Sequence, residues 1–308
     1  ASAMGSIIGP IEKDEGYDPN FSAAANIATA PTGLLIPPSN VMITFSLVSG
    51  GTSVAALFMA GYIPGALWAL ACMLVVYIYA KKFGYRSQTK LTGKEKINAF
   101  IQALPCLLLI IIVIGGIIAG VFTATEGSVV AVVYSLLLSI YGYKSMKWKD
   151  LPEIFRSSAE MTGIIIFLIG VSSIMSWVMA FTNIPTMVSN GLLSISSNKY
   201  VILLMINIIL LVVGTFMDMT PATLIFTPIF LPVCTALGMN TIHFGIMLIF
   251  NLCIGTITPP VGTTLFVGVK VGGVKIETVF KHLLPYFFAI IVVLMLVTYI
   301  PQLSLWLP

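Results

Sequence analysis

Two polar segments interrupt long apolar stretches of this sequence, and they limit what the chain can fold into. Residues 214–222 read Gly-Thr-Phe-Met-Asp-Met-Thr-Pro-Ala, and residues 255–264 read Gly-Thr-Ile-Thr-Pro-Pro-Val-Gly-Thr-Thr. Glycine and proline break the hydrogen-bond ladder of a helix, and the released backbone groups cannot face lipid. Such breaks persist at bilayer depth only where protein or a water-filled cavity covers them, and free carbonyls there suit a cation. The two segments therefore indicate the ion and substrate site of a secondary transporter.

Composition supports a membrane location. Of the 308 residues, 58% are hydrophobic and only 8% are charged, whereas a soluble domain carries roughly 25% charged residues. The formal net charge of +4 does not indicate nucleic-acid binding, because the basic residues lie in connections between apolar runs. No cysteine pair has metal-ligand spacing, so the four cysteines are interpreted as small buried apolar residues without a disulfide.

The order of apolar runs predicts an all-α polytopic membrane protein. Residues 21–49 are interrupted at Thr29–Gly33 and Pro37–Asn40, which predicts two half-helices around an unwound centre. Residues 239–271 form a second interrupted span, and residues 200–237 a re-entrant hairpin with its tip near residue 218. A shorter mixed segment, 185–197, is expected to be an interfacial helix or arm. Plain spans are predicted at residues 61–80, 97–120, 127–143, 157–181 and 279–300.

Basic residues predict the orientation of these spans. If the loop at residues 81–96 is cytoplasmic, the basic segment 144–156 falls on the same side, as do Lys13, Lys270, Lys275 and Lys281. Only Lys199 is then placed outside. The hairpin at residues 200–237 would open toward the outside, and the apolar limb at residues 2–11 toward the cytoplasm.

A shift of 222 positions aligns the chain with itself at its helix-breaking residues. Pro10 then matches Pro232, Gly16 matches Gly238 and Gly33 matches Gly255, and the pair Pro37-Pro38 matches Pro259-Pro260. The predicted topology gives the copies opposite orientations, as in the inverted repeats of secondary transporters. The expected division is the C-terminal part of a first repeat (1–80), a cytoplasmic loop (81–96) and a second repeat (97–308). Because the first copy lacks leading spans and one hairpin limb, the sequence is expected to be part of a longer chain.

The breaks supply candidate ligands for sodium, which prefers oxygen. Carbonyls at the C-terminus of a half-helix carry the negative end of the helix dipole, and threonine adds hydroxyl oxygens. The candidates, for two or more sodium ions, are Thr32, Gly33, Thr215, Asp218, Gly255, Thr256 and Thr258. Asp218 is the only acidic residue between Glu160 and Glu277, and a carboxylate at membrane depth is a functional candidate. The alternative is that Asp218 only caps the second limb of the hairpin.

The complementary half-helices begin at proline-containing segments. Exposed N–H groups at a helix N-terminus can hold a carboxylate of an organic substrate. The candidates for substrate binding are Pro38, Ser39, Asn40, Thr220, Pro221, Gly262 and Thr263. In the alternative interpretation, Ser39 and Asn40 only cap their helix. Glu126 at the mouth of a span is interpreted as a cap for the following helix, with pairing to a neighbouring subunit as the alternative.

Four motifs resemble the large membrane subunit of the tripartite ATP-independent periplasmic (TRAP) transporters. They are Leu35–Asn40 (Leu-Ile-Pro-Pro-Ser-Asn), Phe122–Glu126 (Phe-Thr-Ala-Thr-Glu), Gly214–Asp218 and Asn251–Gly262. The resemblance covers essentially the whole chain. The sequence departs from the family at Gly127, where alanine is expected, and in the missing N-terminal part, which would contribute to one ion site.

The resemblance implies sodium-driven import of an organic acid such as sialic acid or a C4-dicarboxylate across the bacterial inner membrane. It also implies two partners, a small four-helix membrane subunit and a periplasmic substrate-binding protein. The alternative within transport is a stand-alone dicarboxylate or gluconate symporter. An intramembrane hydrolase using Asp218 and His243 is disfavoured, because the sequence contains no GxGD or HExxH motif. The chain is therefore not expected to be an enzyme.

Overall fold

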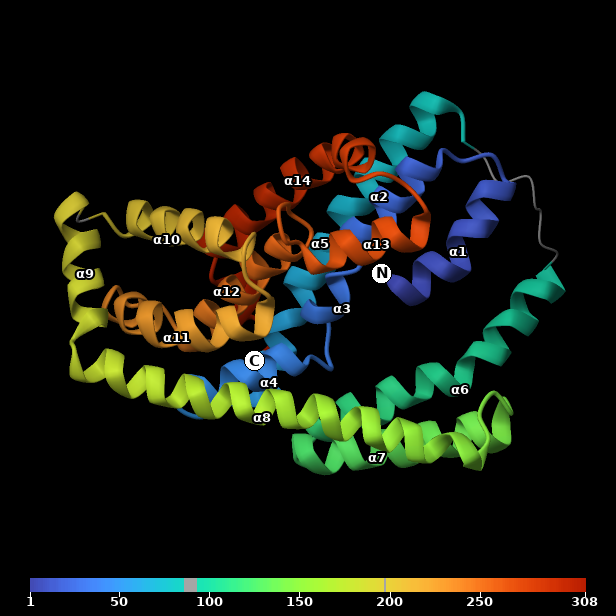
Figure 1. Ribbon diagram of the computed structural model, residues 1–308, viewed down its shortest axis with the longest axis horizontal. Helices are drawn as coiled ribbons and strands as arrows, with labels where there is room; N and C mark the ends of the chain where they lie inside the picture. Colours follow the sequence, from blue (N-terminus) through green and yellow to red (C-terminus); the bar gives the residue numbers. More distant parts are fainter. Residues whose placement is uncertain (86–92, 197) are drawn as a thin grey trace. The chain divides into compact units, whose positions relative to one another are not determined.

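All regular elements in the described residues are helices, as predicted (Figure 1). A computed structural model describes residues 1–85, 93–196 and 198–308. Among these described residues, six helices are long and apolar enough to cross a membrane, or seven if a pair bent by 48° at residues 36–39 forms one span. The helices are α1 (Ser2–Asp14), α2 (Pro19–Thr29), α3 (Thr32–Leu35), α4 (Asn40–Val48), α5 (Val54–Phe83), α6 (Gly93–Ile118), α7 (Ala124–Leu137), α8 (Leu151–Phe181), α9 (Ile184–Ile195), α10 (Lys199–Gly214), α11 (Met219–Ala236), α12 (Thr241–Thr256), α13 (Thr263–Gly272), α14 (Ile276–Tyr299) and α15 (Gln302–Leu305), with a π-helix at Leu138–Gly142 and a 3₁₀ turn at Trp148–Asp150.

The helices form two compact units along the chain. One contains Ala1–Gln88 and Ser172–Pro308, and the other contains Thr89–Val171. Both interrupted spans and the predicted hairpin lie in the first unit, whereas α6 and α7 lie in the second. Of the loop predicted at residues 81–96, residues 86–92 lie outside the described part of the chain. The predicted basic connection at 144–156 is too long, since α8 already begins at Leu151.

Helix α12 is the centre of the first unit. Every residue from His243 to Thr256 is buried, because the helix contacts α10, α11, α14 and α5 on its different sides. Its sequence is apolar around the whole circumference, which is typical of a helix enclosed by others. Trp68 of α5 packs against Phe250 of α12 in a tilted arrangement, with ring centroids 4.8 Å apart.

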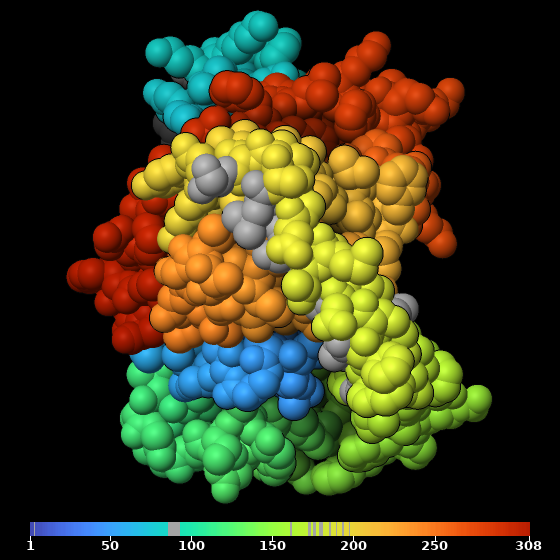
Figure 2. Space-filling view, turned by 90° about the vertical axis from the view of Figure 1, so that its left-hand side faces the viewer, coloured from blue at the N-terminus to red at the C-terminus, as the bar shows by residue number. Residues whose placement is uncertain are grey.

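The helices of the first unit follow the 222-residue offset. Helices α1 and α11 end 222 positions apart, at Asp14 and Ala236, and α2 and α12 begin 222 positions apart, at Pro19 and Thr241. Helix α4 packs against α11, while its counterpart α13 packs against α1; likewise α2 packs against α14 and α12 against α5. Figure 2 shows blue α4 beside orange α11, two segments far apart in the sequence.

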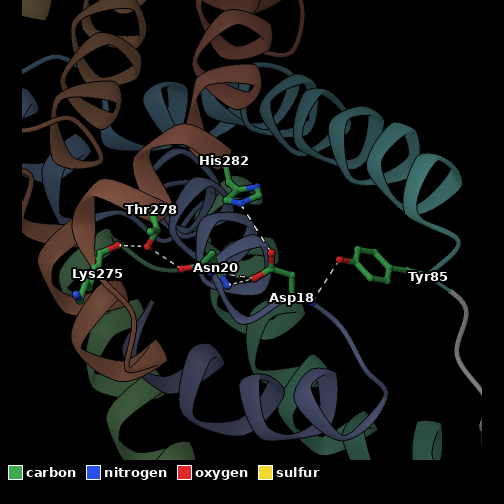
Figure 3. Close-up of polar contacts among 6 residues, drawn as sticks. All are labelled: Asp18, Asn20, Tyr85, Lys275, Thr278 and His282. Carbon is green, nitrogen blue, oxygen red and sulfur yellow. Dashed lines mark hydrogen bonds and ion pairs between the residues drawn. The ribbon is translucent and has the colours of Figure 1, made fainter.

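A polar cluster joins the start of α2 to the end of α5 and the start of α14 (Figure 3). Asp18 caps α2 by accepting a hydrogen bond from the backbone N–H of Asn20, at 2.8 Å. Thr278 of α14 donates its hydroxyl proton to Oδ1 of Asn20 at 2.8 Å, and Nε2 of His282 lies 3.9 Å from Oδ2 of Asp18. The hydroxyl of Tyr85, after α5, accepts the N–H of Asp18 at 3.4 Å. These contacts fix the ends of three helices.

In the second unit, α6 packs against α7. Thr123 and Glu126 form a capping box at the start of α7, where each side chain accepts the backbone N–H of the other. This confirms Glu126 as a helix cap. Cysteines 72, 234 and 253 are buried and all four cysteines are free, but Cys106 of α6 is exposed. The prediction of burial was wrong for Cys106 because α6 carries much of its apolar surface outward.

Candidate functional site

The first break separates α2 from α4. The hydroxyl of Thr32 donates to the carbonyl of Thr29 at 2.5 Å, and Trp68 Nε1 donates to the carbonyl of Ala28 at 2.8 Å. Proline cannot donate a backbone hydrogen bond, and the Pro37-Pro38 peptide bond is cis. Gly33 is exposed in the short helix α3, immediately before this turn.

The second break separates α12 from α13 and has the same design. The Pro259-Pro260 bond is cis, and threonine hydroxyls again turn back to main-chain carbonyls. Thr256 donates to Cys253 at 2.8 Å and Thr258 to Ile254 at 2.6 Å. A hydroxyl that gives its proton to a carbonyl keeps its oxygen lone pairs for a cation. Both predicted interruptions are therefore confirmed as breaks in the helices.

The turn between α10 and α11 lies directly against the second break. A Cβ atom added at Gly255 would lie 2.4 Å from the carbonyl oxygen of Gly214, so position 255 has no room for a side chain. The backbone N–H of Val261 donates to the carbonyl of Thr215 at 3.1 Å. The predicted tip of the hairpin is thereby attached to the segment between α12 and α13.

Asp218 occupies the N-cap position of α11 without making a side-chain capping bond. Its Oδ1 instead accepts the hydroxyl proton of Thr263, the first residue of α13, at 3.3 Å. The carboxylate is exposed at the turn. The structure thus brings together Asp218, a candidate ligand for sodium, and Thr263, a candidate residue for substrate binding. Gly262 completes this cluster, since a Cβ there would lie 2.7 Å from the carbonyl oxygen of Thr258.

Ser39 and Asn40 begin α4 in a comparable way. Ser39 has extended backbone geometry at the N-cap position, yet its side chain makes no capping bond. The residue is only 1% exposed, and its hydroxyl has no hydrogen-bond partner among the described residues. Asn40 and Pro38 are exposed beside it. Thr220 and Pro221 are half-buried in the first turn of α11, which packs against α4.

The first break contacts the last turns of α12, just before the second break. The thiol of Cys253 lies 3.9 Å from the carbonyl oxygen of Pro31, and helix α12 contacts α3. Thr32 and Gly33 follow Pro31, while Gly255 and Thr256 follow Cys253. The candidate residues on the two interrupted spans therefore belong to one region of the first unit.

Comparison with known proteins identifies the family. A profile described as "Tripartite ATP-independent periplasmic transporter, DctM component" matches residues 1–303. The chain is 36% identical over 307 residues to the C4-dicarboxylate TRAP transporter large permease protein DctM of Pseudomonas aeruginosa, covering 100% of this chain and 72% of that protein. The chain belongs to the DctM family of TRAP transporters.

Two other relatives are covered to a similar extent. The sialic acid TRAP transporter large permease protein SiaM of Vibrio cholerae is 36% identical over 296 residues, 96% of this chain and 69% of that protein. An uncharacterized protein of Salmonella typhimurium, YgiK, is 52% identical over 308 residues, covering 100% of this chain and 71% of that protein. This DctM-family chain is a permease subunit of the bacterial inner membrane and not an enzyme.

Sequence reasoning missed a buried amide pair in this permease. Nδ2 of Asn251 in α12 donates to Oδ1 of Asn207 in α10 at 2.8 Å, and Nδ2 of Asn207 donates to the hydroxyl of Thr298 in α14 at 3.2 Å. His243 joins α12 to α14 through the carbonyl of Val297, at 2.8 Å. These four residues, Asn207, His243, Asn251 and Thr298, are all buried. The signal in the sequence was an isolated asparagine in each of two apolar runs, because a buried amide needs a hydrogen-bond partner.

Proposed function

We propose that this DctM-family permease imports a small organic acid together with sodium. The observation that carries the proposal is the contact between Cys253 and Pro31, which joins two helix breaks in one unit. Discontinuous helices of this kind bind ions and substrate in secondary transporters, with carbonyl ends for the cation and N-termini for the anion.

Sodium would bind on the C-terminal side of each broken helix. The first group of ligands would come from Thr32 and Gly33, and the second from Thr215, Gly255, Thr256 and Thr258. The described residues contain no group of three or more histidine, cysteine, aspartate or glutamate residues that could hold a metal. This favours a site made of main-chain and hydroxyl oxygens, and such oxygens suit a hard monovalent cation better than a transition metal. Asp218 would contribute negative charge at the exposed edge of the second group.

The substrate would lie at the opposite ends of the breaks. Pro38 and Ser39 directly precede α4, which begins at Asn40. Thr220 and Pro221 lie in the first turn of α11, and Gly262 directly precedes Thr263, the first residue of α13. The unpartnered hydroxyl of Ser39 supports this assignment, because a buried hydroxyl without a partner is costly unless a ligand or water supplies one. Relatives carry the names of sialic acid and C4-dicarboxylate transporters, and both substrates contain a carboxylate that helix N-termini can hold.

Two partners would complete the transporter. The family description names a tripartite periplasmic transporter, which supports a small four-helix membrane subunit and a periplasmic protein that delivers the substrate. A substrate-binding protein also explains how a site made mainly of backbone and hydroxyl groups obtains its selectivity. The partner protein would select the acid before it reaches the membrane.

The coupling would come from ordering of the breaks. Sodium between the carbonyl ends would hold the tip at residues 215–218 against the second break and so assemble the N-termini that hold the anion. The unit that contains the breaks would then move the bound ligands relative to a scaffold of plain spans. The separation of the breaks and of α6–α7 into different compact units supports this division of labour.

Reconstitution with both partners tests the proposal. Proteoliposomes would be given labelled succinate or sialic acid with an inward sodium gradient, or with potassium replacing sodium at the same membrane potential. We expect accumulation of one acid only with the sodium gradient and the binding protein. Equal accumulation in potassium would exclude sodium coupling, and full uptake without the binding protein would favour a stand-alone symporter.

A further inference from the structure

A cavity of about 460 Å³ lies between α1, α2 and α13, away from the breaks described above. Its volume is in the range of small-molecule sites, roughly 300–1,000 Å³. Glycines form much of its wall, including Gly5 and Gly9 of α1 and Gly268 of α13. Its polar lining includes Lys13, Ser22 and Asn26. These three side chains offer a positive charge, a hydroxyl and an amide.

Ser22 supplies the deepest polar group of this cavity. The residue is only 5% exposed, and among the described residues its hydroxyl oxygen has no hydrogen-bond partner. An unpaired buried hydroxyl costs about 1–3 kcal/mol, and a ligand or water in the cavity would remove that cost. Glu12 lies beside Ser22, and burial raises the pKa of its carboxyl group.

The second half of the repeat has no equivalent arrangement. The position of Ser22 corresponds, 222 residues later, to Phe244, which is fully buried with its ring centroid 6.1 Å from that of Phe45. The positions of Lys13 and Asn26 correspond to Thr235 and Leu248. A Cβ at Gly245 would lie 2.5 Å from the ring of Phe45, so aromatic side chains fill this place. The polar cavity is thus a property of the first half and not a consequence of the shared helix packing.

We propose that this cavity is a second binding site for a small organic carboxylate, with Lys13 pairing with the carboxylate and Ser22 and Asn26 binding its polar groups. The proposal takes its ligand class from the proposed function and places that ligand at a separate position. Lys13 lies near the end of α1, on the side predicted to be cytoplasmic. The site would therefore hold the acid after it leaves the breaks.

Cysteine protection tests this site directly. Ser22→Cys would be introduced with Cys106→Ala, because Cys106 is the exposed native thiol and the other three are buried. The full-length permease with its partners would be placed in nanodiscs without sodium and treated with a small cationic methanethiosulfonate. We expect succinate or sialate to slow modification of the new thiol, whereas succinamide, the uncharged analogue, should not. The proposal would be overturned if the thiol did not react, or if neither succinate nor sialate slowed its modification relative to the sample without ligand.

Two further variants separate this site from the breaks. Lys13→Gln should raise the succinate concentration for half-protection about tenfold, the loss expected for one charge-assisted contact. Lys281→Gln, at an exposed lysine of α14 outside the cavity lining, should leave it unchanged. Protection that is insensitive to Lys13→Gln but lost in Asp218→Asn would show that the acid acts from the breaks. That result would overturn the second site and leave the proposed function standing. Sodium-independent uptake with intact protection would instead overturn sodium coupling and leave the second site standing.

Discussion

The thiol of Cys253 lies 3.9 Å from the carbonyl oxygen of Pro31, and the two residues are separated by 222 positions, the offset of the internal repeat. Residues related by a two-fold repeat can touch each other only near the axis that relates them. Each residue stands next to the break of its own half. The contact therefore explains how two breaks, distant in the sequence, form one region in which an ion and a substrate could be bound together.

Gly255→Ala should disturb this region, whereas the same change at its counterpart Gly33 should not. The new Cβ at position 255 would lie 2.4 Å from the carbonyl oxygen of Gly214, while at position 33 it would meet no atom within 4 Å. Backbone cannot yield as a flexible side chain can, so we expect Gly255→Ala to lower the free energy of unfolding by about 1–3 kcal/mol. Gly33→Ala should change it by less than about 1 kcal/mol. Thermal unfolding of the purified variants would measure both, and equal effects would contradict the close contact.

Asp218→Asn should weaken the dependence of uptake on sodium without unfolding the protein. Asparagine keeps the shape of the side chain and can still accept the hydroxyl proton of Thr263, which is now 3.3 Å from Oδ1. Only the charge is lost. We expect the sodium concentration for half-maximal uptake to rise about tenfold or more. Thr263→Ser, which keeps the hydroxyl that donates to position 218, is the matched conservative control and should leave the sodium dependence unchanged. A normal sodium dependence of Asp218→Asn would leave Asp218 with a structural role at the start of α11.

The sequence was sufficient to predict where the helices break, because glycine and proline act locally. Both interrupted spans and the turn before Asp218 were found at the expected residues. Helix ends were less predictable: α5 continues through Lys81 and Lys82 to Phe83, and α8 begins at Leu151, so both extend beyond the apolar windows that suggested them. Polar residues can continue a helix beyond its apolar part, so hydropathy marks the apolar section and not the helix.

Contacts between distant residues could not be predicted from the sequence. Nothing local shows that Asp218 meets Thr263, since the bond depends on how α11 and α13 are placed by α12. The Asn207–Asn251 pair also requires the packing of α10 on α12. The repeat offset identified equivalent positions, but it did not show that Pro31 and Cys253 touch. Sequence patterns therefore suggested the regions of the site, and packing determines which atoms meet.

Asn207→Leu should lower the free energy of unfolding of the permease, although leucine and asparagine are similar in size. The substitution removes the acceptor for Nδ2 of Asn251, at 2.8 Å, and the donor for Thr298. Asn251 would keep only its bond to the backbone carbonyl of residue 207, at 3.0 Å, and its own Oδ1 already lacks a partner among the described residues. A buried group left unsatisfied costs about 1–3 kcal/mol. Unfolding of both single variants and of Asn207→Leu with Asn251→Leu gives the coupling; strictly additive losses would contradict a shared network.

Glu12→Gln should stabilise the protein at neutral and alkaline pH. Burial raises the pKa of the Glu12 carboxyl group. Because the folded protein holds this proton more tightly than the unfolded chain does, stability falls as pH rises from the unfolded to the folded pKa, and the loss persists above it. Glutamine is always neutral and avoids that loss. The unfolding temperature of Glu12→Gln should therefore exceed that of the parent at pH 8, and the gain should shrink below about pH 4. Asp14→Asn, at an exposed neighbour in α1, is the control, and an equal gain at both pH values would contradict the burial of Glu12.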